Sequence, residues 1–223
     1  MSTDYELADR PPSPPAAPAT SAAPQGHPGR VALTWTLTVL AWGGAVLALS
    51  VSGALARLPL TVLPLLVVLG IALPLLGVRL DPTSRRAVAE VDIAHLTWFN
   101  AWRVPAALVF FAVGARGLLP PQFVANAAWG DLVAGALAPL VVLVGARLHG
   151  AARRRAYLGF HLFSFGDFVV AVGTGLAFTL LGDPLMRTLL ETPMALIPLW
   201  GVPLTGAVSL LALHRLLGRD PRP

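Results

Sequence analysis

Six long apolar segments constrain the fold of this chain more than any other feature of its sequence. A helix that crosses a lipid bilayer needs about 20 mostly apolar residues. Six segments reach that length, at about 31–54, 58–78, 94–115, 122–146, 157–182 and 194–214. The apolar runs are continuous and do not alternate with polar residues, so they do not fit the strands of a membrane β-barrel. The sequence therefore predicts an all-α, polytopic transmembrane bundle of six helices.

The composition supports a membrane bundle and excludes several kinds of chemistry. Hydrophobic residues make up 56% of the 223 positions and charged residues 12%, about half the charged share of a typical soluble domain. Cysteine is absent, which excludes disulfides, thiolate nucleophiles and Cys-ligated metal sites. Lysine is absent too, which excludes a P-loop lysine and Schiff-base chemistry. Because no common catalytic motif is present, the sequence favours a protein that is not an enzyme and has no cofactor.

The two ends of the chain differ from its apolar centre. Residues 1–30 hold seven prolines and little that could form a core, which predicts a disordered cytoplasmic tail. They lack the basic start and short apolar stretch of a cleaved signal peptide, so we expect the first apolar segment to stay in the mature protein. The transmembrane domain would then cover residues 31–217, and a short cytoplasmic tail would cover 218–223.

The arginines predict how the bundle is oriented. Loops on the cytoplasmic side of a membrane carry an excess of basic residues. If the N-terminus is inside, twelve of the sixteen arginines lie on the inner side, Arg103 lies within a span, and Arg57, Arg116 and Arg187 lie outside. Arg and Ala usage is typical of a GC-rich bacterial genome. We therefore expect a protein of the bacterial cytoplasmic (inner) membrane with both termini in the cytoplasm.

One short basic run, from Arg153 to Arg155, lies on the predicted inner side. Basic residues beside a membrane attract anionic lipid headgroups by about 1 kcal/mol each, so we expect this run to bind anionic lipid. The arginines flank apolar runs and do not form a patch with interleaved aromatic residues, so nucleic acid is not an expected partner. The sequence names no protein partner.

Three charged residues lie inside the apolar segments. Arg103 and Asp131 each lie nine residues into their spans, and Asp167 lies ten residues into its own. At 1.5 Å of rise per residue, all three fall roughly 14–15 Å deep, near the middle of a hydrocarbon core about 30 Å thick. An unpaired charge at that depth costs about 2.5–3.5 kcal/mol. We therefore expect the three side chains to face the bundle interior and to meet.

Three polar residues accompany these charges. Asn100 and Ser164 each lie about one turn from the charged residue of their own span, and Asn126 lies above Asp131. We interpret all six side chains as one polar network centred on Arg103. Because one arginine cannot neutralise two carboxylates, either one aspartate is protonated or the network is negatively charged.

Two functions fit such a network. In the first, the protein is a small carrier or channel-like protein, in which Arg103 binds an anionic group or tunes the acids and one aspartate exchanges a proton. In the second, it is a non-catalytic scaffold or accessory subunit, and the same residues form a structural ion-pair network. An open cavity beside the network would favour transport, and dry packing would favour the scaffold.

Histidines near the predicted inner boundary leave a third function open. Side chains such as His95, His161 and His214 on facing helices could hold a haem or a metal, as in a haem- or quinone-linked redox protein. No HxxxH, HExxH or CxxCH spacing is present. Interfacial histidines near lipid headgroups explain the same positions.

Short motifs recur between spans. Trp-Arg-Val-Pro at 102–105 resembles Trp-Gly-Val-Pro at 200–203, and Ala-Trp-Gly occurs at 41–43 and at 128–130. Both pairs join one span to the third span after it, as a 3+3 inverted repeat of the transporter kind would. Coincidence is the alternative, because Trp, Gly, Ala and Pro are common in this chain.

A resemblance to known proteins rests on one stretch of the chain. The stretch begins at Trp102-Arg103 and continues through Leu119-Pro120, Phe123, Trp129-Gly130-Asp131 and Asp167. It resembles a group of bacterial multi-pass integral membrane proteins without an assigned function. The resemblance covers roughly the last four spans. It implies a bacterial membrane protein and adds emphasis to the three charged residues, and it implies no activity.

Overall fold

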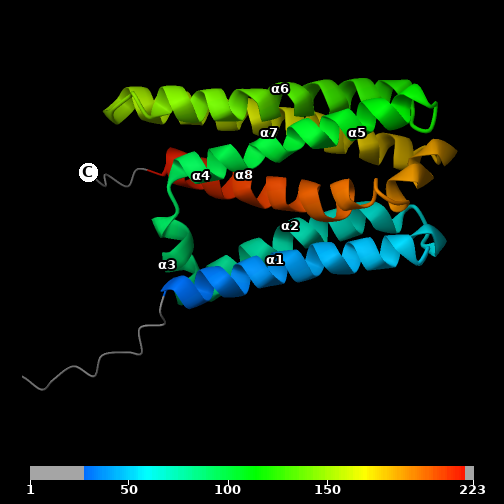
Figure 1. Ribbon diagram of the computed structural model, residues 1–223, viewed down its shortest axis with the longest axis horizontal. Helices are drawn as coiled ribbons and strands as arrows, with labels where there is room; N and C mark the ends of the chain where they lie inside the picture. Colours follow the sequence, from blue (N-terminus) through cyan, green and yellow to red (C-terminus); the bar gives the residue numbers. More distant parts are fainter. Residues whose placement is uncertain (1–27, 219–223) are drawn as a thin grey trace, which may run out of the picture.

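The protein is described here by a computed structural model that covers residues 28–218, and Figure 1 shows long helices that run back and forth along one axis. No strand occurs in that range. The α-helices are α1 (Pro28–Val51), α2 (Val62–Leu80), α3 (Pro82–Glu90), α4 (Ile93–Trp98), α5 (Arg103–Ala115), α6 (Pro121–Gly145), α7 (Gly150–Leu180) and α8 (Val202–Leu217). The shorter helical turns are η1 (Leu55–Arg57), η2 (Phe99–Trp102), η3 (Pro184–Leu190) and η4 (Ile197–Gly201).

Six helical stretches are long and apolar enough to cross a membrane, which confirms the all-α architecture and the number of segments predicted from the sequence. They are Gly29–Val51, Val62–Leu80, Ile93–Ala115, Pro121–Gly145, Gly150–Leu180 and Ile197–Leu217. The largest difference from prediction is α7, which begins at Gly150 instead of 157 because arginine is a good helix former and extends the helix. Residues 1–27 and 219–223, which hold most of the two predicted tails, lie outside the described residues.

Helix α8 lies in the middle of the bundle (Figure 1). It packs against α7 on one side and against α2 on the other. In the sixth span, which consists of η4 and α8, 67% of the apolar window is buried inside the protein, against 11% for α1 and 17% for α2. The α1–α2 hairpin therefore presents most of its apolar surface outward, and contiguous exposed apolar surface of this kind is typical of contact with a membrane.

Both ends of the described chain lie at one end of the bundle, together with α3 (Figure 1). This is what an even number of spans requires. Nine described arginines belong to the loops and helix ends on that side, and three belong to the other side. The nine are Arg30, Arg79, Arg85, Arg86, Arg147, Arg153, Arg154, Arg155 and Arg215.

Aspartate caps begin two helices at the α3 end. The carboxylate of Asp81 accepts a hydrogen bond from the backbone N–H of Ser84 at 2.8 Å, and that of Asp92 accepts one from the N–H of Ala94 at 2.7 Å. Such caps satisfy N–H groups that have no partner within the helix. The N–H of Ala94 is also the largest cause of a lowered pKa for the Asp92 carboxyl.

The third and sixth spans are irregular at the Trp-x-Val-Pro motif. Trp102 ends the 3₁₀ turn η2, and Trp200 lies in the π turn η4. Proline three residues later lacks an N–H and frees a backbone carbonyl one turn earlier. The indole N–H of Trp102 donates to Thr205 Oγ1 at 3.0 Å, whereas that of Trp200 donates to the Val39 carbonyl at 2.9 Å. The two motifs thus share a local irregularity and differ in their partners.

Candidate functional site

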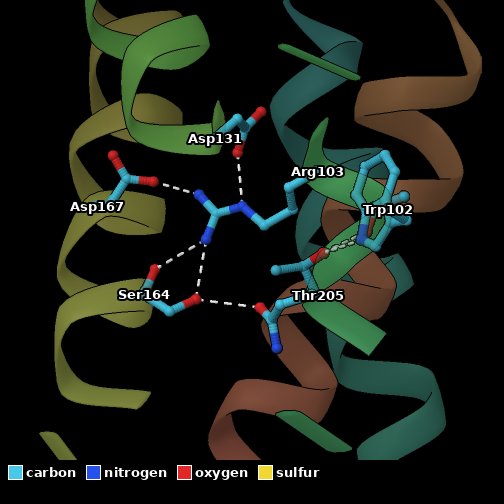
Figure 2. Close-up of polar contacts among 8 residues, drawn as sticks. Trp102, Arg103, Asp131, Ser164, Asp167 and Thr205 are labelled. Atoms are coloured by element: carbon cyan, nitrogen blue, oxygen red, sulfur yellow. Dashed lines mark hydrogen bonds and ion pairs between the residues drawn. The ribbon is translucent and has the colours of Figure 1, made fainter. Parts of the chain in front are cut away.

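Arg103 is the centre of the candidate site (Figure 2). It lies at the start of α5, and its side chain is only 2% exposed. Its Nε donates to Asp131 Oδ1 at 2.6 Å, and its Nη2 donates to Asp167 Oδ2. Its Nη1 donates to Ser164 Oγ at 2.8 Å and to the Ser164 carbonyl at 3.3 Å. The structure therefore brings together three charged side chains from α5, α6 and α7.

Two glycines of α6 allow the helices to approach closely enough for these contacts. A Cβ atom at Gly130 would collide with the carboxylate of Asp167. A Cβ atom at Gly135 would lie 2.7 Å from the backbone nitrogen of Val104. A larger residue at Gly130 would displace the Asp167 carboxylate, and one at Gly135 would have to move α5 away, so the two glycines position the site.

Asn100 joins the network through Ser164. The hydroxyl of Ser164 donates to Asn100 Oδ1 at 3.0 Å. The amide nitrogen of Asn100 donates in turn to the carbonyls of Leu96 and Thr97, at 3.2 and 3.3 Å. These contacts carry the network from the guanidinium toward the α3 end of the bundle.

Asn126 does not join the network, and this part of the prediction was wrong. Its amide nitrogen donates to Thr174 Oγ1 at 3.0 Å, and its oxygen accepts from Gln122 at 3.1 Å. Asn126 precedes Asp131 by five residues, which turns an α-helix by about 1.4 turns. The two side chains therefore lie on different faces of α6.

The three histidines do not form a common site. His161 is completely buried, and its Nε2 lies 3.1 Å from Thr97 Oγ1. The Thr97 hydroxyl already donates to the Ile93 carbonyl, so it accepts from His161, whose Nδ1 has no partner among the described residues. His95 and His214 are exposed. Residues 28–218 contain no group of three or more His, Cys, Asp or Glu side chains that could hold a metal ion.

A cavity of about 170 Å³ adjoins Arg103 and Asp131. Trp102 and Thr205 line it beside the charged side chains, and Asp167 lies outside its wall. The rest of the wall is mostly apolar and comes from α2, α5, α6, α7, η3, η4 and α8. Among the lining side chains are Val67, Ile71, Phe110, Phe123 and Phe168. The network therefore borders the cavity at Arg103 and Asp131, while the side chain of Asp167 lies outside the cavity and is 11% exposed.

The site combines one guanidinium with two carboxylates. With both carboxylates ionised, its net charge is −1. Within residues 28–218, the cavity wall carries no charged side chain besides Arg103 and Asp131. The only local compensation for the second carboxylate is therefore a proton or a bound cation.

Most of the arginine run at the start of α7 is engaged by protein. Arg153 pairs with Asp92 at 3.2 Å. Arg154 donates to the Leu216 carbonyl at 2.9 and 2.6 Å, which satisfies a carbonyl at the end of α8. Arg155 donates to a carbonyl of its own helix. Of the three, Arg155 has the side chain with the most freedom to contact lipid.

Two contacts near the site did not follow from the sequence reasoning. The Thr97–His161 contact had a signal, because Thr97 lies three residues before Asn100 and therefore on a similar helix face. The sequence signal for the Trp102–Thr205 contact was weaker. The recurring Trp-x-Val-Pro motif indicated that the third and sixth spans share a feature, but it did not indicate that they touch.

A comparison with protein families gives one match. The profile described as a domain of unknown function (DUF8737) matches residues 59–217. This range covers the second to sixth spans and every residue of the site. No curated protein and no solved structure matches the chain.

Proposed function

The chain belongs to the DUF8737 family, whose function is unknown, and we propose that it is a small carrier of the bacterial cytoplasmic membrane. Its ligand would bind beside Arg103, Asp131 and Asp167. The observation that carries this proposal is the cavity of about 170 Å³ at the charged network. The six apolar helices supply the membrane-spanning body.

The cavity favours ligand binding over a purely structural role. A structural ion-pair network needs no empty space, and a cavity beside it forfeits packing contacts. The volume is also sufficient for a small molecule, since an engineered apolar cavity of about 150 Å³ binds benzene. A binding site explains both the cavity and the buried charges, whereas a structural network explains only the charges.

The proposal includes an orientation and a proton. The α3 end would face the cytoplasm, because arginine-rich loops stay on that side. One aspartate would exchange a proton, because a net charge of −1 at the middle of the bilayer is costly and a proton removes it. Arg103 would tune the two acids and hold them in place.

The scaffold remains the second candidate, and the hydrogen bonds of Arg103 support it. Asp131, Ser164 and Asp167 surround the guanidinium from two helices, as a structural network would. In that case the cavity would be closed to water. Access to the cavity therefore separates the two candidates.

Neighbouring alanines of α6 provide the test. The chain has no cysteine, so a single introduced cysteine has no background. Ala127 lines the cavity, while Ala128 is equally buried and lies outside its wall. In sealed proteoliposomes we expect benzyl methanethiosulfonate, an uncharged reagent that can reach the cavity from water or from the bilayer, to modify Ala127→Cys much faster than Ala128→Cys. If both cysteines are inert, the cavity is closed and the scaffold is favoured.

Single cysteines in the same cysteine-free chain also test which end of the bundle faces the cytoplasm. Ala89 lies at the α3 end and Gln122 at the opposite end, and both are exposed. In intact bacterial cells, a membrane-impermeant maleimide should label Gln122→Cys and should label Ala89→Cys only after the cells are opened. The reverse pattern would invert the proposed orientation.

A further inference from the structure

We infer that the cavity binds a lipophilic monovalent cation, which competes with a proton for Asp131. The cation would be compact, with one permanent positive charge and an apolar body about the size of an aromatic ring. This inference rests on the proposed function and names the ligand class of the same site. Four observations lead to it: the use of the Arg103 donors, the unused oxygen of Asp131, the charge balance and the apolar wall.

Arg103 has little left to offer an anion. A guanidinium carries five N–H groups. Its Nε uses one for Asp131, Nη1 uses two for Ser164, and Nη2 uses one for Asp167. Four of the five are therefore engaged by the protein, and an anionic ligand would have to displace a carboxylate.

The unused hydrogen-bonding capacity beside the network is an acceptor. Trp102 donates its indole N–H to Thr205, and the Thr205 hydroxyl donates to the Gly201 carbonyl at 2.9 Å. Asp131 accepts from Arg103 through Oδ1, and no described residue donates to its Oδ2 (Figure 2). Thr179, the other polar residue of the wall, carries a neutral hydroxyl. A ligand at this end of the cavity therefore meets a carboxylate oxygen without a partner.

A bound cation and a proton on Asp131 would each compensate the same single negative charge of the site. The charged groups that face Asp131 are Arg103 from α5 and Asp167 from α7. On the sides formed by α2 and α8, the cavity wall has no titratable side chain within residues 28–218. His161 lies six residues before Asp167 on α7 and is hydrogen-bonded to Thr97. When the cation enters, the protonated Asp131 carboxyl releases its proton and the carboxylate pairs with the cation, so the net charge stays at zero.

The remaining wall suits the apolar body of such a ligand. The rings of Trp102, Phe110 and Phe123 line the cavity, and aromatic faces attract cations. Val68 on α2 and Leu176 on α7 also line it, and they are 59% and 39% exposed on the bundle. The cavity therefore reaches the apolar surface between α2 and α7, where a lipophilic ion dissolved in the bilayer would arrive.

Binding of benzyltrimethylammonium to the purified full-length protein in detergent tests this inference. Neopentylbenzene, its uncharged isostere, and phenylacetate, an anion of similar size, serve as comparison ligands. We expect the cation to bind most tightly, with an affinity that rises about tenfold per pH unit while Asp131 is protonated in the free protein. A pH indicator in weakly buffered solution should detect about one proton released per bound cation, since the exchange is one for one.

Three variants complete the test. Asp131→Asn should abolish both cation binding and proton release. Ala127→Leu should fill the cavity and abolish binding while leaving the charged network intact, which guards against a folding defect in the first variant. Asp92→Asn removes a carboxylate far from the cavity and should leave binding unchanged.

Equal affinity for the three ligands, a preference for phenylacetate, or cation binding without proton release would overturn the inference. Different results would reject this inference and the proposed function. A reactive Ala127→Cys without cation binding rejects the cation alone, whereas an inert Ala127→Cys rejects the carrier as well.

Discussion

The α1–α2 hairpin and the group formed by α5, α6 and α7 lie on opposite sides of α8 and are held by different interactions (Figure 1). The three-helix group contains the buried ion network of Arg103, Asp131 and Asp167. The described part of the hairpin has no ion pair. It contacts the sixth span at Gly43 beside Trp200 and at Gly70 beside Pro203. The network therefore belongs to one side of α8, while the cavity lies between the two sides. Movement of the hairpin against α8 would change the cavity without breaking the network.

The largest expected effect comes from breaking the ion network. Arg103→Met leaves the buried carboxylate of Asp131 and the partly exposed one of Asp167 without their partner. Breaking a buried ion pair in this way typically costs about 3–5 kcal/mol of the free energy of unfolding. Unfolding in mixed detergent–SDS micelles measures this cost. The triple variant Arg103→Met, Asp131→Asn, Asp167→Asn removes the charges together and should recover most of the lost stability. A cost below about 1 kcal/mol for Arg103→Met would mean that the network does not hold the three helices.

Neighbouring glycines test how closely the hairpin is packed. A Cβ atom at Gly43 would lie 2.9 Å from the indole ring of Trp200, whereas one at Gly44 would meet nothing within 4 Å. Gly43→Ala should therefore cost about 1–3 kcal/mol through overpacking, and Gly44→Ala should cost nothing. The same unfolding assay compares them. Equal effects would show that α1 is free to move away from η4.

The two tryptophan motifs should differ by a smaller amount. Trp102→Phe leaves the buried Thr205 hydroxyl without its donor and should cost about 1 kcal/mol beyond the lost packing. Trp200→Phe removes a donor from the Val39 carbonyl, which lies within α1 and keeps its helical partner, so it should cost less. If the costs are reversed, the hairpin contact is the stronger of the two.

The smallest expected effect lies outside both regions, at the cap of α4. Asp92→Ala removes the bond to the Ala94 N–H and should cost about 1 kcal/mol or less at pH 7. Because the pKa of the Asp92 carboxyl is lowered in the folded protein, its contribution is present above the unfolded pKa of about 3.9 and is lost as pH falls through the folded value. Comparing unfolding of Asp92→Ala and wild type at pH 7 and near pH 3 checks this, and a difference that grows in acid would contradict it.

The sequence predicted how deep the polar residues lie in their spans better than it predicted on which helix face each side chain lies. Counting residues placed Arg103, Asp131 and Asp167 at one level, and the cost of buried charge required them to meet. The same counting placed Asn126 above Asp131 and in the same network, but the two side chains lie on different faces of α6. The cavity was not predictable at all, because its volume depends on how α2 and α7 pack across α8, and six apolar segments do not specify that packing.

The central position of α8 has a consequence for how the protein is made. A ribosome synthesises the chain from its N-terminus, so the hairpin and the three-helix group would both enter the membrane before the helix that joins them exists. Until then, the surfaces of α2 and α7 that later contact α8 would face lipid or one another. Among the described helices, α8 therefore completes the bundle, and loss of α8 during synthesis would leave two helical groups without a common core.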